Sequence, residues 1–169
     1  MGATSSAGFS WATKVRQFRA HLRARVDPVE RARLATWLTT AQLAVFDAMH
    51  VADRRHGIDV VATLRAAGTT DPELLLAGLL HDCGKGQTGV LPRVTWSLGE
   101  AWGGWVIDAG RHVPGWDAAL DRLRDHAALS AEMALAAGCS ARTAELIRHQ
   151  ADPVEPGAGE LLRLADEAN

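Results

Sequence analysis

The stretch LLLAGLLHDCGKG, residues 74–86, carries the most hydrophobic segment of the chain directly into a group of ionisable residues. Its first seven residues are all apolar or small, so a helix formed by them has no polar face. This is typical of a helix buried in the middle of a helical bundle. His81, Asp82 and Lys85 follow at once. We expect a rigid buried helix whose carboxyl end, supplied by Gly84, presents polar side chains at a fixed place.

Helix signals flank this stretch on both sides, and no segment has a convincing strand pattern. The sequence DPVE at residues 27–30 offers an aspartate cap, a proline in the first turn and a glutamate at the third position, which is typical of a helix start. Gly68 and Gly138 stand where helical periodicity stops and favour a left-handed helix end. These signals predict an all-α fold, a single bundle of about seven helices.

The predicted helices can be given in chain order. They cover approximately residues 11–22, 28–45, 51–67, 72–80, one or two segments between 87 and 116, and then 127–137, 140–150 and 159–168. The segment between residues 96 and 116 holds four of the six tryptophans. These tryptophans could pack in a core, form an apolar lid for a nucleobase, or form a hydrophobic surface for a partner such as a second copy of the chain in a homodimer.

Composition and charge exclude several classes of function. The chain has 169 residues, of which 47% are hydrophobic, and this is enough for one domain with a real core. A formal net charge of −2 provides no cationic face, so we expect no extended nucleic-acid binding. No apolar run approaches the roughly 18 residues of a transmembrane segment, and the first residues lack a signal-peptide pattern. Because Cys83 and Cys139 match no zinc or redox motif, we expect reduced thiols in a cytoplasmic protein.

Six ionisable residues fall where the predicted helices could converge. They are four histidines and two aspartates: His56, His81, His126, His149, Asp82 and Asp166. Neutral imidazole and carboxylate groups are suitable ligands for divalent transition metals, and helical bundles build such sites from side chains on facing helices. The pattern therefore predicts a metal centre at the end of the buried helix.

The order of these residues resembles a known signature. His56, the pair His81-Asp82 and, much later, Asp166 are similar to the motifs of the HD superfamily of metal-dependent phosphohydrolases. The segments DRRHGIDVVATLRAAG, LLHDCGKG and LLRLADEAN, which surround these residues, support the resemblance. It covers about residues 50–169 and implies an HD domain there. We expect residues 1–49 to form N-terminal helices that pack on the bundle, either as part of it or as a separate packing arm.

The resemblance also implies a set of metal ligands. One divalent ion would be held by His56, His81, Asp82 and Asp166. In two-metal relatives, the segments that correspond to DHAALSAEMALAAGCS and ELIRHQ contribute further histidines, which here would be His126 and His149, with Asp82 bridging the two ions. The implied cofactor is one or two ions of manganese, iron, cobalt, zinc or magnesium. Some relatives have two consecutive histidines where this chain has His149-Gln150.

The activity implied by the resemblance is hydrolysis of a small phosphorylated substrate, a phosphate ester such as a nucleotide. Asp82 and Lys85 would be catalytic, because a metal-activated water attacks phosphorus while an ammonium offsets charge on the phosphoryl oxygens. Lys85 is one of two lysines among eighteen basic residues, although a cation that complements a helix dipole would also explain it. Arg55 could extend the phosphate site or belong to a solvated face. Asp53, one turn before His56, could orient that imidazole.

Two other functions remain open from the sequence. Certain relatives with the same ligand order are di-iron oxygenases that oxidise a small polyol or phosphonate. Imidazole and carboxylate ligands serve iron as well as manganese or zinc, so ligand identity does not separate the two reactions. The other alternative is a catalytically silent HD domain used for binding or signalling.

Overall fold

The computed structural model describes residues 24–169, so the helix expected over residues 11–22 lies outside the described part of the chain. The described residues form α-helices, one short 3-10 helix and no strand, which confirms the all-α prediction for them. None of these helices is both long and apolar enough to span a bilayer. The helices are α2 (Pro28–Leu34), α3 (Thr40–Ala48), α4 (Val51–Ala66), α5 (Pro72–Leu80), η1 (Cys83–Lys85, the 3-10 helix), α6 (Val90–Trp102), α7 (Trp105–Arg111), α8 (Asp117–Arg124), α9 (His126–Ala136), α10 (Ala141–Arg148) and α11 (Ala158–Ala168).

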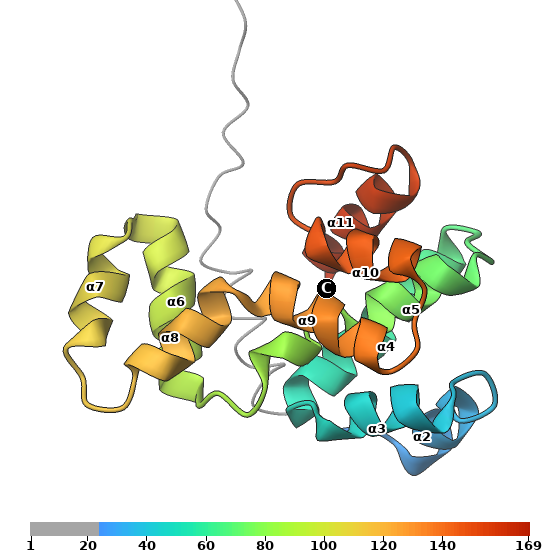
Figure 1. Ribbon diagram of the computed structural model, residues 1–169, viewed down its shortest axis with the longest axis horizontal. Coiled ribbons are helices and arrows are strands. Elements are labelled where there is room, and N and C mark those ends of the chain that lie inside the picture. Colours follow the sequence, from blue (N-terminus) through green and yellow to red (C-terminus); the bar gives the residue numbers. More distant parts are fainter. Residues whose placement is uncertain (1–23) are drawn as a thin grey trace, which may run out of the picture.

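Helix α5 is the centre of the larger part of the molecule. Every residue from 74 to 80 is buried, as the uniformly apolar sequence predicts. Asp71 caps the helix by accepting hydrogen bonds from the backbone N–H groups of Glu73 and Leu74. Helices α3, α4, α10 and α11 pack around α5 (Figure 1). The four neighbouring helices therefore all pack against one buried central helix.

The described residues contain ten α-helices, so the prediction of about seven was too low. The segment expected as one helix over residues 28–45 is broken, because Thr39 and Gln42 form a reciprocal capping box that starts α3. The tryptophan-rich segment continues into three helices, α6 to α8. Gly103 and Gly115 separate them with backbone φ angles of 108° and 83°, which favour glycine.

The turn after α5 brings the ionisable residues against α9. Gly84 does not end α5 as expected, because the helix already stops at Leu80 and the positive φ of 61° belongs to Gly86. Gly84 is instead required for close packing. A Cβ atom at this position would lie 2.3 Å from the carbonyl oxygen of His126 and 2.7 Å from the backbone nitrogen of Ser130. The missing side chain allows η1 to contact α9.

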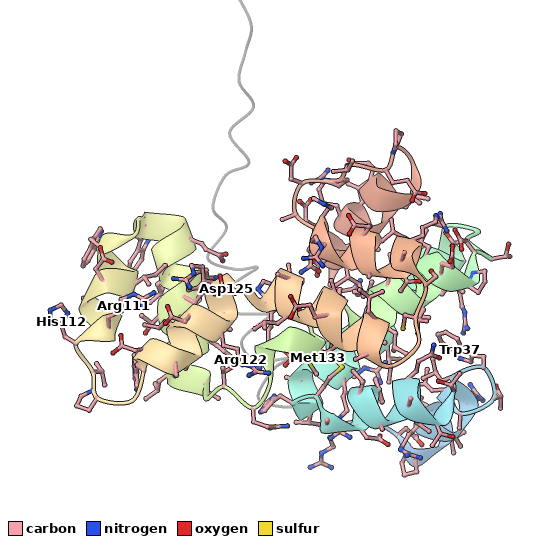
Figure 2. All side chains as sticks on the ribbon, in the orientation of Figure 1. Trp37, Arg111, His112, Arg122, Asp125 and Met133 are labelled. Atoms are coloured by element: carbon pink, nitrogen blue, oxygen red, sulfur yellow. The ribbon has the colours of Figure 1, made fainter. Side chains whose placement is uncertain are left out.

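Helices α6, α7 and α8 gather at one end of the molecule, where α8 contacts α9 and η1 (Figure 1). Arg122 of α8 lies at this junction (Figure 2) and donates a hydrogen bond from Nε to the carbonyl oxygen of Gly84 at 2.8 Å. Trp102 at the end of α6 and Trp105 at the start of α7 are 49% and 66% exposed. These two side chains therefore do not pack in the core, whereas the roles of lid and partner surface stay predictions.

Candidate metal centre

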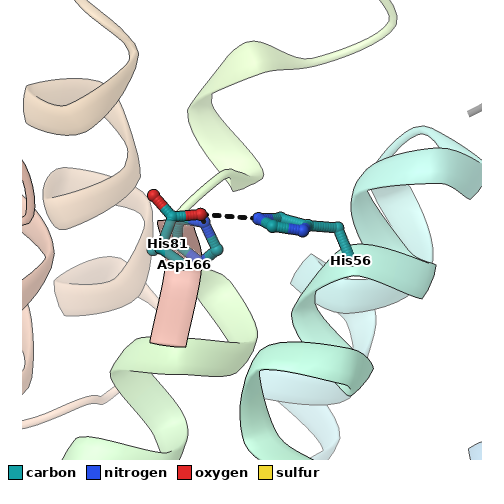
Figure 3. A group of neighbouring side chains, drawn as sticks. All are labelled: His56, His81 and Asp166. Atoms are coloured by element: carbon teal, nitrogen blue, oxygen red, sulfur yellow. Dashed lines mark hydrogen bonds and ion pairs between the residues drawn. The ribbon is translucent and has the colours of Figure 1, made fainter. Parts of the chain in front are cut away.

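Three helices that are far apart in the sequence each contribute one side chain to a compact cluster. His56 comes from α4, His81 from the end of α5 and Asp166 from α11 (Figure 3). One possible ligand atom from each residue lies within 4.8 Å of those from the other two. The His56 Nε2 atom lies 2.7 Å from Asp166 Oδ1, which also lies 3.4 Å from His81 Nε2. Among residues 24–169, no other group of three or more His, Cys, Asp or Glu side chains lies close enough together to hold a metal ion.

His81 is the buried member of the cluster, with an exposed fraction of 1%. Its Nδ1–H group donates to the carbonyl oxygen of Gly78 at 3.0 Å, which directs Nε2 into the cluster. That Nε2 atom is buried and forms no hydrogen bond with any of the described residues. Asp166 Oδ1 and Asp82 Oδ1 lie 3.4 Å and 3.6 Å away. A buried nitrogen between two carboxylates is suited to a cation, either a proton or a metal ion.

Asp82 lies beside the cluster and is almost fully buried. Its Oδ2 atom accepts a hydrogen bond from Lys85 Nζ at 2.6 Å, whereas Oδ1 faces the Nε2 atoms of His81 and His126 at 3.6 Å and 3.7 Å. Burial alone would raise the pKa of Asp82, but the charges of Lys85 and His81 outweigh burial and hold that pKa well below its usual range. Asp82 is therefore a carboxylate at neutral pH.

Among the described residues, His126 and His149 do not form a possible metal-binding group with Asp82. His126 is mostly buried, and burial and the charge of Lys85 lower its pKa, so the ring is neutral at neutral pH. His149 is instead 40% exposed, and its Nε2 atom lies 3.4 Å from Glu145 Oε2 on its own helix. The neighbour of His149 faces His126, because Gln150 Nε2 lies 3.2 Å from His126 Nε2. The sequence prediction missed this role of Gln150.

Two residues expected near the site have other partners. Arg55 bonds Glu30 and Asp59, with Nη1 to Glu30 Oε2 at 2.6 Å and Nη2 to Asp59 Oδ1 at 2.8 Å. Asp53 was expected to orient the His56 ring, but its carboxylate binds Arg93 through two hydrogen bonds of 2.6 Å and 2.7 Å. The expectation failed because the partner of Asp53 lies forty positions later in the sequence, and no local sequence pattern connects the two residues.

Arg93 supports the turn that carries Lys85. Besides Asp53, its guanidinium donates to the carbonyl oxygens of Gly86 at 3.0 Å and Thr88 at 3.1 Å. The Arg93 and Asp53 side chains are only 12% and 6% exposed. Because Arg93 belongs to α6, the ion pair joins α4 to α6. The backbone hydrogen bonds of Arg93 also hold the segment between η1 and α6.

Breaking this ion pair is expected to destabilise the protein strongly. Replacing one member leaves a buried charge without its partner, so Asp53→Ala and Arg93→Met should each lower the free energy of unfolding by about 3–5 kcal/mol. The double variant Asp53→Leu with Arg93→Met should recover part of this loss, because no unpaired charge remains. Urea unfolding of all variants measures these differences. Single variants within about 1 kcal/mol of the original protein would contradict the role of the pair.

Protonation of His81 predicts how metal binding depends on pH. Burial alone would lower the pKa of His81, but the charges of Asp82 and Asp166 outweigh burial and raise the pKa to about 9. Below that pH, a metal ion must displace a proton from His81 before it can bind there. We expect the affinity for Zn²⁺ to rise at least about tenfold per pH unit from about pH 6 to about pH 8. Calorimetric titration in buffers of different ionisation enthalpy measures both the affinity and the released proton, and an affinity independent of pH would contradict His81 as a ligand.

The described structure is thus an all-α protein with a His56–His81–Asp166 cluster that could hold a metal ion. Comparison with protein-family models, curated proteins and solved structures finds no significant match for this chain.

Proposed function

We propose that this protein is a metal-dependent phosphohydrolase that acts on a phosphate ester, with nucleotides among the candidate substrates. One observation carries the proposal: the buried Nε2 atom of His81, which has no hydrogen bond among the described residues, faces Asp166 and Asp82 with His56 beside it. The order of these residues along the chain supports the same reaction, because it resembles the HD superfamily signature.

The residues fit a divalent transition-metal ion. Two imidazole nitrogens and a carboxylate suit manganese, iron, cobalt or zinc, and they would come from His56, His81 and Asp166, with Asp82 Oδ1 close by. The side chains of His56 and Asp166 are 25% and 38% exposed, so one side of the cluster is open to solvent and to a substrate. When bound, such an ion would supply Lewis-acid polarisation of a phosphoryl oxygen and lower the pKa of a water molecule.

Lys85 would stabilise negative charge on the substrate. Burial alone would lower the pKa of Lys85, but the charges of Asp82 and Asp53 outweigh burial and raise it, so the ammonium stays charged. Its Nζ atom carries three N–H donors, and the contact with Asp82 uses one of them. The remaining donors are available for the non-bridging oxygens of a phosphoryl group, where charge increases during the reaction.

Phosphate release tests this proposal. The metal-free protein is given manganese, cobalt, iron, zinc or magnesium in turn, together with a panel of nucleotides and simple phosphate esters. We expect release with at least one metal and none after Asp166→Ala. The matched control is Glu167→Ala, which removes a carboxylate from the adjacent exposed position, where it pairs with Arg163. No release with any metal would contradict the proposal, and oxygen consumption by the iron form would favour the di-iron oxygenase instead.

A further inference from the structure

The arrangement around Asp82 differs from the two-metal site that the resemblance implies. In that site Asp82 would bridge two ions, and His126 and His149 would hold the second. Each of these three residues has a contact that opposes this role. Lys85 contacts Asp82, Gln150 contacts His126, and Glu145 contacts His149.

Asp82 cannot give one oxygen to each of two ions, because Lys85 binds one of its two carboxylate oxygens. Its Oδ2 atom accepts a hydrogen bond from Lys85 Nζ at 2.6 Å, and its Oδ1 atom faces the Nε2 atoms of both His81 and His126, at 3.6 Å and 3.7 Å. A second divalent ion at Oδ2 would have to displace the Lys85 ammonium or lie beside it. Like charges a few ångströms apart in a mostly buried place repel strongly. Lys85 therefore binds the Asp82 oxygen that a second ion would need if each ion took one oxygen.

The metal-binding atom of His126 is also engaged. The Nδ1–H group of His126 donates to the carbonyl oxygen of Leu123 at 2.7 Å, so Nε2 of the neutral ring is an acceptor. The Gln150 side chain is 6% exposed, and its Nε2–H group donates to that acceptor at 3.2 Å. The lone pair that would bind a metal ion therefore receives a hydrogen bond. His149, which would complete the second site, lies against Glu145 on the exposed side of its helix.

We propose that the centre holds one metal ion, at His56, His81 and Asp166, and that Lys85 and Gln150 exclude a second. Gln150 is a positioning residue that holds His126 as a neutral imidazole with its proton on Nδ1. The inference rests on the metal site of the proposed function. Turning the Gln150 amide over would remove its hydrogen bond to His126 and present Oε1, which is buried and forms no hydrogen bond with the described residues, but Lys85 would still bind Asp82 Oδ2.

Counting bound ions tests this inference without any assay of activity. The metal-free chain is saturated with Zn²⁺, freed of excess metal, and measured for zinc and protein. We expect one ion per chain in the original protein, in His126→Ala and in His149→Ala, and none in Asp166→Ala. Two ions per chain in the original protein would overturn the inference and leave a metal-dependent function intact. No bound ion would instead remove the metal site, and with it the proposed function.

Two further measurements test whether Lys85 and Gln150 are the reason that only one ion binds. In nitrogen NMR spectra of the histidine rings, Zn²⁺ should shift the His81 Nε2 resonance, while His126 keeps its Nδ1–H tautomer and its own Nε2 resonance. The double variant Lys85→Met with Gln150→His removes both obstacles and adds an imidazole, so we expect it to bind two ions. Metal coordination at His126 in the original protein would overturn the inference. A double variant that still binds one ion would show that Lys85 and Gln150 are not what excludes the second.

Discussion

Lys85→Ala is expected to lower the rate of phosphate release by about 10²–10³-fold, because it removes a charge that stabilises the transition state. The effect should appear in kcat more than in KM, since the charge on the phosphoryl oxygens grows only as the reaction proceeds. The variant should keep one metal ion, because Gln150 still occupies the His126 nitrogen. Steady-state kinetics and a zinc count on the same preparation measure both effects.

The control for Lys85 separates charge from geometry. Lys85→Arg keeps a positive charge but presents a larger, planar group, and it should recover only part of the rate. Arg124→Ala removes a positive charge from an exposed side chain that pairs with Asp125, and its rate should match that of the original protein. Full activity in Lys85→Ala would remove Lys85 from the mechanism.

Removal of the metal is expected to lower the melting temperature by about 5–10 °C. A ligand present at about 100 times its dissociation constant stabilises the folded state by about 2.7 kcal/mol. For a chain of this size, each kcal/mol corresponds to about 2–4 °C. Thermal unfolding of the zinc-saturated protein with and without chelator measures the shift.

The matched variants for this experiment are neighbours in α11. Asp166→Ala should abolish the response to chelator, and its half-exposed position should limit the damage to packing. Glu167→Ala, at the exposed position that follows, should keep the full response. A melting temperature that is indifferent to chelator and to added metal in the original protein would contradict the metal site.

The sequence predicts those features of the fold that depend on local interactions. The capping box of Asp27 and Glu30 and the left-handed end at Gly68 both occur as expected, because each uses residues within one turn of helix. The break before α3 was missed, since apolar residues continue to reach the core across it, as Leu38 does. Hydrophobic periodicity reports which residues face the core and does not show that the backbone remains helical. The capping pair Thr39 and Gln42 was the signal that could have located the break.

The sequence predicts the candidate site less completely. The convergence of His56, His81 and Asp166 was expected from the order of the motifs, and the structure brings these residues together. The neighbours of the cluster depend on contacts between distant segments and on side-chain direction at helix ends, which no local pattern records. At the end of α10, a difference of one position decides that Gln150 and not His149 faces His126.

The central claim is that His56, His81 and Asp166 bind a metal ion. Anomalous X-ray diffraction at the zinc absorption edge, from crystals of the zinc-saturated protein, tests it most directly. We expect one strong peak within about 2.0–2.2 Å of the His56 and His81 Nε2 atoms and of an Asp166 carboxylate oxygen. Saturated crystals with no peak there, or with zinc bound only elsewhere, for example beside His149 and Glu145, would contradict the claim.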